Sequence, residues 1–217
     1  MCFSATASLV AGGVLVTIGG LTLSRAKTKK EIPLASIPLL FGIQQIIDGV
    51  VWLSFGVQPL NTITIYTYAL FSRVWWPIFL PLSVILTEPN RKRKNILRIF
   101  SLLGLFVGLF FLYFILTGPV TANIIHDCIV YDVSYPYMPI ILTLYLVATC
   151  GACLFSSHKM LKVFGVALFI SFFISGWFYF EKFSSTWCFF SAILSAIIYW
   201  NRPKRPIRFA MGMNGRD

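Results

Sequence analysis

Long apolar runs separated by short polar stretches extend from the first residues of the chain to about residue 201. A helix of roughly 20 apolar residues is long enough to cross the hydrocarbon core of a bilayer, which is about 30 Å thick. The pattern therefore predicts an all-α integral membrane protein, in which residues 1–201 form a single domain, a seven-helix transmembrane bundle. The expected spans lie near residues 4–23, 33–56, 63–86, 96–117, 137–156, 162–180 and 186–201, of which the last is the shortest.

Basic residues occur in alternate connections between these spans. Apart from Arg73 and Lys182, the 18 lysines and arginines lie in residues 25–30, 91–98, 159–162 and 202–216. Cytoplasmic connections of membrane proteins carry an excess of Lys and Arg. The sequence thus predicts that the N-terminus lies outside and the C-terminus in the cytoplasm, with a basic cytoplasmic tail over residues 202–217.

Composition agrees with lipid as the main solvent. The chain is 58% hydrophobic and 12% charged, with a mean hydropathy of +0.81, whereas soluble domains have about a quarter of their residues charged. The net charge of +11 is divided among short blocks, so we expect the bilayer's anionic headgroups at the cytoplasmic face as the partner, and no nucleic acid. No Lys or Arg precedes the first apolar run, so we expect it to be a retained helix rather than a signal peptide.

Two charged residues, Asp48 and Arg73, lie within the second and third expected spans. Charged groups inside a bilayer are costly and often functional. Their depths nearly match, so neighbouring antiparallel helices would bring them together as an ion pair. Gln44, Gln45 and Trp52 share the helical face of Asp48, and these five residues are called the polar cluster below. The sequence leaves open whether the pair fixes helix packing or belongs to a substrate or ion site.

Further reactive side chains are expected on the outer side of the membrane. These are Cys2, His126, Asp127, Glu181, Trp187 and Cys188, together with Cys128. Three outer cysteines permit one disulfide in an oxidising compartment, and the sequence leaves all three pairings open, with Cys2–Cys188 preferred. No metal site is expected, because the ligand types lack a recognised spacing. Cys150 and Cys153 are interpreted as two packed thiols rather than a redox pair.

Small residues and prolines predict details of the helix packing. Gly104 and Gly108 form a pair separated by three residues, which lets a neighbouring backbone approach closely. Pro77 and Pro81 each remove a backbone donor and are expected to kink the third span.

Three segments resemble a known family. They are Met1–Ser8, with the sequence MCFSATAS, the stretch from Pro38 to Trp52, and Trp187–Ala192. They are similar to the corresponding segments of an uncharacterised family of prokaryotic multi-pass membrane proteins, whose members carry a domain of unknown function over nearly their whole length. The resemblance implies a multi-pass protein of the inner cell membrane. It implies no activity and no cofactor.

Three function classes remain after these observations. The first is binding or transport of a small molecule or ion through the polar cluster in the outer half of the bundle. The second is a membrane-embedded enzyme that acts on a lipid or quinone at the outer leaflet, and the third is a non-catalytic assembly protein. The enzyme ranks below the transporter because no nucleophile and base have a recognisable spacing. The sequence indicates neither a cofactor nor an oligomeric state.

Overall fold

The chain forms a bundle of long helices in the computed structural model, which describes residues 4–26, 28–125, 128–132, 135–178 and 183–195. Within these residues, 6 helical stretches are long and apolar enough to cross a membrane. They correspond to the first six predicted spans. Their bounds are Ala5–Ser24, Lys29–Ser54, Leu60–Thr87, Arg91–Thr117, Met138–Phe155 and Lys159–Trp177.

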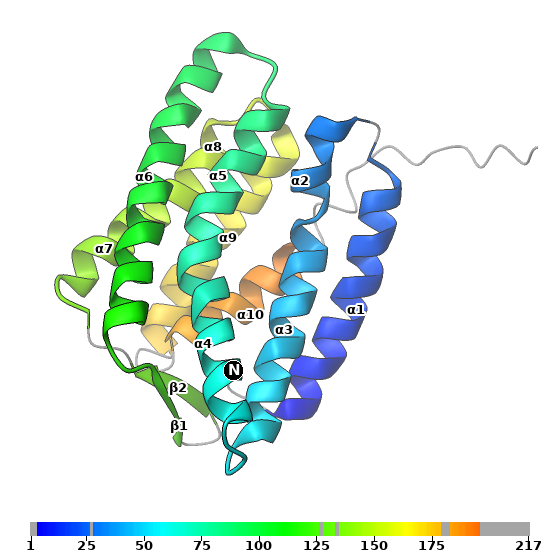
Figure 1. Ribbon diagram of the computed structural model, residues 1–217. Coiled ribbons are helices and arrows are strands. Elements are labelled where there is room, and N and C mark those ends of the chain that lie inside the picture. Colours follow the sequence, from blue (N-terminus) through cyan, green and yellow to red (C-terminus); the bar gives the residue numbers. More distant parts are fainter. Residues whose placement is uncertain (1–3, 27, 126–127, 133–134, 179–182, 196–217) are drawn as a thin grey trace, which may run out of the picture.

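Several of these stretches consist of more than one element (Figure 1). The first half of the chain contains α1 (Ala5–Ser24), η1 (Lys29–Glu31), α2 (Ile32–Ala35), α3 (Ile37–Ser54), α4 (Leu60–Ala69), η2 (Leu70–Trp75), α5 (Trp76–Thr87) and α6 (Arg91–Thr117). The second half contains α7 (Met138–Leu146), η3 (Val147–Gly151), α8 (Ala152–Phe155), α9 (Lys159–Phe178) and α10 (Phe183–Ser195). Both η2 and η3 are π-helical turns inside otherwise α-helical spans.

The seventh predicted span, residues 186–201, is only partly described. Its described part belongs to α10, a helix of 13 residues, which at 1.5 Å per residue is about 20 Å long and shorter than a bilayer core. The α10 helix packs against α9 and α3 and also contacts α1. Residues 196–201 and the predicted basic tail lie outside the described residues.

The connection between α6 and α7 adds two short strands to the otherwise helical fold. It contains an antiparallel hairpin of β1 (Thr121–Ile125) and β2 (Cys128–Asp132). Ile129 and Tyr131 of β2 are buried against an apolar cluster that includes Val51, Tyr68 and Ile115. The hairpin therefore packs its apolar face on the ends of α3, α4 and α6, and Figure 1 shows it at the same end of the bundle as the turn between α3 and α4. This end is called the hairpin end below.

The opposite end carries basic connections that contact one another. Glu88, after α5, accepts a hydrogen bond from the backbone N–H of Ser157 at 2.7 Å. Arg93 Nη1 donates to the carbonyl of Ser156 at 3.0 Å. The α5–α6 and α8–α9 connections therefore lie at one end of the molecule, as the alternation of charge predicts.

Glycines allow close helix packing at two interfaces. A Cβ added at Gly104 would clash with the carbonyl of Pro77, and one at Gly108 would lie 2.6 Å from Ile78, so the predicted glycine pair does hold α6 close to η2 and α5. A second interface joins α1 and α3, where a Cβ at Gly12 would lie 3.0 Å from the carbonyl of Gly42.

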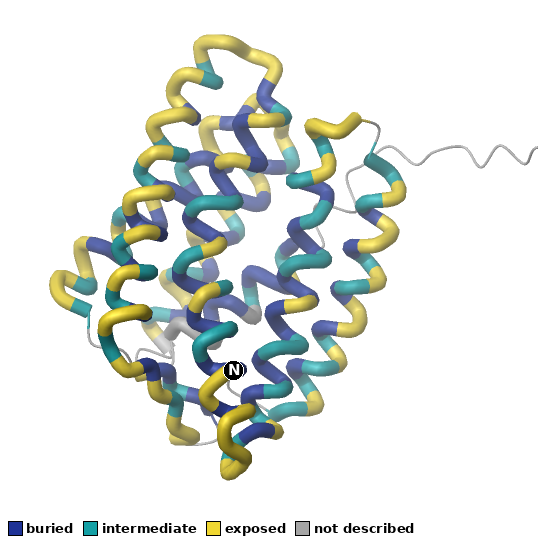
Figure 2. The backbone as a smooth tube through the Cα atoms, viewed as in Figure 1, coloured by how far each residue is buried: buried dark blue, intermediate teal, exposed yellow. Residues whose placement is uncertain are grey.

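The outward faces of the bundle are apolar. In Figure 2, exposed positions follow the outer sides of α1 and α6, and on these helices Val10, Leu102 and Leu116 are 61%, 67% and 73% exposed. Large apolar surfaces of this kind are unfavourable in water and favourable in lipid. The surface thus agrees with a membrane protein.

Candidate functional site

Asp48 is a buried carboxyl group that joins three elements. It lies on α3 and is 1% exposed. Its Oδ2 accepts a hydrogen bond from Ser8 Oγ of α1 at 2.9 Å. Its Oδ1 accepts one from the hydroxyl of Tyr131 on β2 at 3.0 Å. The carboxyl group therefore connects the hairpin to the first two spans.

Two stacked tyrosines cover this carboxyl group on the side of the hairpin. The rings of Tyr68 and Tyr131 lie 4.4 Å apart with an interplanar angle of 11°. Burial and the negative charge of Asp48 both raise the pKa of Tyr131 well above its usual value. The phenol thus stays protonated across the physiological pH range and donates a hydrogen bond to the carboxyl group.

The glutamine side chains of the polar cluster point into the bundle, as predicted. Gln44 and Gln45 are 0% and 1% exposed. Gln44 Oε1 accepts a hydrogen bond from the indole N–H of Trp76, whose ring stacks on Phe41 at a centroid distance of 3.8 Å. Gln45 Oε1 and Trp52 Nε1 are buried without a hydrogen-bond partner, and the Gln44 side chain also lies within reach of the Cys188 thiol.

Arg73 lies in the π-helical turn η2 and is 7% exposed. Its guanidinium carbon lies 5.6 Å from the centroid of the Tyr135 ring, within the range of a cation–π interaction. Its Nη1 is buried without a hydrogen-bond partner. The carbonyl of the preceding residue, Ser72, accepts a hydrogen bond from the hydroxyl of Tyr145 at 2.9 Å. Single π turns inside α-helices are frequent at functional sites.

The predicted ion pair between Asp48 and Arg73 is not formed. Both residues are described, and Asp48 contacts Ser8 and Tyr131, whereas the guanidinium of Arg73 lies over Tyr135. Asp48 and Arg73 do lie at similar depths, because the hydrogen bonds Gln44–Trp76 and Ser54–Thr64 fix how the second span lies alongside the third. The direction of the Arg73 side chain differs from that expected of a regular α-helix. A π turn contains one extra residue, which rotates the side chains around it.

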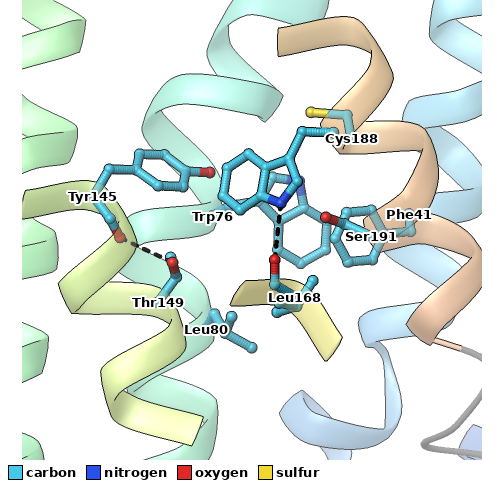
Figure 3. Close-up of a pocket in the computed structure, with 9 residues that line it drawn as sticks. Phe41, Trp76, Leu80, Tyr145, Thr149, Leu168, Cys188 and Ser191 are labelled. Carbon is cyan, nitrogen blue, oxygen red and sulfur yellow. Dashed lines mark hydrogen bonds between the residues drawn. The ribbon is translucent and has the colours of Figure 1, made fainter. Parts of the chain in front are cut away.

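Two small cavities lie beside the polar cluster. One, of about 40 Å³, is lined by Arg73 and Ser72 of η2 and by Phe111, Met138, Leu142, Tyr145, Trp187 and Cys188. The other, of about 20 Å³, is lined by Phe41, Trp76, Leu80, Tyr145, Thr149, Leu168, Trp187, Cys188 and Ser191. Figure 3 shows Tyr145 and Cys188 approaching the second cavity from different helices. Trp187 and Cys188 therefore line both cavities, which places these two predicted residues at the site.

The predicted disulfide between Cys2 and Cys188 is wrong. Cys188 is a free, buried thiol, as are Cys150 and Cys153, whereas Cys128 is disulfide-bonded. The free state of Cys150 and Cys153 agrees with their interpretation as packed thiols. The other outer candidates, Cys2, His126, Asp127 and Glu181, lie outside the described residues.

Within the described residues, no group of three or more His, Cys, Asp and Glu side chains could hold a metal ion. Bridging hydrogen bonds instead dominate the site. They come from residues that the sequence did not single out, namely Ser8, Trp76, Tyr131 and Tyr145, while Tyr68 contributes by stacking on Tyr131. A tyrosine or tryptophan in the sequence does not by itself indicate a functional site inside the bundle, because these residues are also common at membrane interfaces.

The family model for a family of unknown function, DUF6629, matches residues 1–211. The chain belongs to this family. The match covers almost the whole chain, and it confirms the resemblance to an uncharacterised domain family that the first, second and seventh predicted spans indicated. Neither the curated proteins nor the solved structures contain a match to this chain. This family has no assigned activity.

Proposed function

We propose that this protein binds a small molecule or an ion in the polar cluster and carries it into or across the membrane. The cluster lies inside the bundle near the hairpin end. It is built from α3 and η2, and α1, β2, α7 and α10 hold or cover it.

The observation that carries the proposal is a set of buried polar atoms without partners. Gln45 Oε1, Trp52 Nε1 and Arg73 Nη1 all belong to the cluster. Leaving one buried polar group unsatisfied costs about 1–3 kcal/mol, and buried polar groups in proteins nearly always have partners. A bound ligand that supplies donors and acceptors would remove this cost. Polar and charged residues inside membrane bundles commonly mark such pathways.

The proposal includes the membrane topology. We place seven spans in a cell's inner membrane, with the hairpin end outside and the C-terminus in the cytoplasm. The distribution of Lys and Arg supports this orientation, as does the contact between the two basic connections around Glu88 and Ser157. Single cysteines introduced in residues 91–95 should react only from the cytoplasm, and those in residues 120–125 only from outside. Labelling of both segments from the same side would overturn this topology.

The ligand-binding role can be tested with Gln45→Leu, which removes a buried acceptor that has no partner. Full-length protein in lipid nanodiscs is screened by thermal unfolding against sodium, potassium, chloride, nitrate, amino acids and short carboxylates. Ser175→Ala is the matched control, because Ser175 Oγ is also buried without a partner but lies on α9, outside the cluster.

Both substitutions should stabilise the empty protein by a similar amount, since each removes an unsatisfied group. A panel member that stabilises the wild type and the Ser175→Ala protein should lose its effect on the Gln45→Leu protein. If no panel member acts on the wild type, or if all three proteins respond equally, the cluster is not the binding site.

A further inference from the structure

We propose that the ligand of this site is a small monovalent anion, held by Arg73 in the 40 Å³ cavity between η2, α6, α7 and α10. This inference rests on the proposed function and names the class of ligand. Halides, nitrate and formate belong to this class.

The positive charge at the cavity comes from Arg73. Its side chain is more than nine-tenths buried, it lines the cavity, and its Nη1 has no hydrogen-bond partner. A guanidinium remains protonated at any accessible pH, so it cannot avoid the cost of burial by losing its charge. An anion in the cavity would supply the missing acceptor.

The acidic side chain of the cluster, Asp48, already has hydrogen-bond partners other than Arg73. Asp48 accepts hydrogen bonds from Ser8 and Tyr131 at its two oxygens. The remaining wall of the cavity beside Arg73 contains the hydroxyl of Ser72, the phenol, indole and thiol of Tyr145, Trp187 and Cys188, and apolar side chains, and no carboxylate. One guanidinium therefore faces the cavity without an opposing charge inside it, which suits a single negative charge rather than two.

The size of the cavity limits the ligand. One water molecule needs roughly 10–15 Å³ by this measure, so a cavity of about 40 Å³ accommodates about three water-sized groups. Chloride, formate and nitrate fit this volume. Sulfate carries two charges, and gluconate is far larger. The apolar wall of Phe111, Met138 and Leu142 also favours anions that lose their hydration shell easily.

The backbone supports a fixed position for the guanidinium. Arg73 lies inside a π turn, and the hydroxyl of Tyr145 holds the adjacent carbonyl of Ser72. That carbonyl therefore already has its donor and is turned toward Tyr145 rather than toward an anion.

The test is equilibrium binding of radiolabelled chloride to full-length protein in nanodiscs, with sodium held constant. We expect saturable binding that formate and nitrate displace and that sulfate and gluconate leave unchanged. Arg73→Gln should weaken binding by about tenfold or more, because it removes the charge that makes the strongest hydrogen bonds. Arg98→Gln is the matched control, since Arg98 is an exposed arginine on α6, and its binding should equal that of the wild type.

A second variant covers the case in which Arg73→Gln does not fold. Leu142→Phe adds volume to the cavity wall and keeps the charge, and it should also abolish chloride binding. Equal loss in the Arg73→Gln and Arg98→Gln proteins would mean non-specific attraction and would overturn the anion site. Absence of chloride binding, with a cation or a larger molecule still acting through Gln45, would overturn the anion site and leave the proposed function standing.

Discussion

The hydroxyl of Tyr145 donates a hydrogen bond to the carbonyl of Ser72 at 2.9 Å. In the i→i+5 pattern of a π turn, that carbonyl would accept from residue 77, which is Pro77 and has no N–H. Tyr145 therefore takes the place of the missing backbone donor. The α7 helix thus stabilises the π turn that directs Arg73 away from Asp48.

Removing this donor should destabilise the bundle. Tyr145→Phe leaves the buried carbonyl of Ser72 without a partner, at a cost of about 1–3 kcal/mol. Thermal unfolding in detergent measures the change. Tyr113→Phe serves as control, because Tyr113 is 62% exposed on α6 and its loss of a hydroxyl should change the midpoint little. Equal midpoints for the two variants would contradict the role assigned to Tyr145.

A double-mutant cycle can separate the partners of Asp48. Tyr131→Phe and Asp48→Asn act on the same hydrogen bond, so their effects on the free energy of unfolding should be non-additive, by about 0.5–3 kcal/mol. Arg73→Gln and Asp48→Asn should show the smaller coupling, because the two side chains contact different groups. A larger coupling between Arg73 and Asp48 would instead support the ion pair that the sequence predicts.

The contact between the basic connections should depend on pH. Burial raises the pKa of Glu88, but hydrogen bonds from Ser157 and Asn90 outweigh this and hold it below its ordinary value of 4.5. A carboxyl group with a lowered pKa stabilises the folded protein above its unfolded-state pKa, and this stabilisation is lost as the pH falls through the folded-state value.

The measurement compares the thermal midpoints of the wild type and of the Glu88→Gln protein from pH 7 down to pH 3. The difference should be largest at neutral pH and should shrink below about pH 4.5. Ser157→Ala removes the hydroxyl that donates to Glu88 and should reduce the pH dependence. A constant difference across this range would contradict the assignment.

The disulfide of Cys128 gives a chemical test of the hairpin end. The chain has 5 cysteines, and Cys150, Cys153 and Cys188 are free. Cys2, which lies outside the described residues, is the cysteine left in the same chain, so we expect a Cys2–Cys128 pair. Mass spectrometry of non-reduced peptides should find that pair and an alkylatable Cys188 after unfolding. A Cys128–Cys188 peptide would contradict it.

The spans were predictable because hydropathy is a property of continuous sequence. The first predicted span, 4–23, differs from α1 by about one residue at each end. The lack of Lys and Arg in the loop between α6 and α7 does not by itself indicate the hairpin. Its β-branched and aromatic residues, such as Ile124, Val130 and Tyr131, are typical of strands and could have indicated it.

The polar cluster was only partly predictable. Helical periodicity placed Gln44, Gln45 and Asp48 on one buried face, because α3 is a regular helix. The match in depth between Asp48 and Arg73 did not give the direction of the arginine side chain, because Arg73 lies in a π turn that rotates the residues around it. The partners Ser8 and Tyr131 come from distant segments, which a pattern within one helix cannot bring together.

The most direct test of the binding role is an experimental structure of the full-length protein in lipid, at a resolution that shows ordered ions. We expect non-protein density within hydrogen-bond distance of Arg73 Nη1 or Gln45 Oε1, two atoms that are buried in this structure without hydrogen-bond partners. The contradicting result is a site in which these atoms pair with other side chains of the chain and no density lies between them.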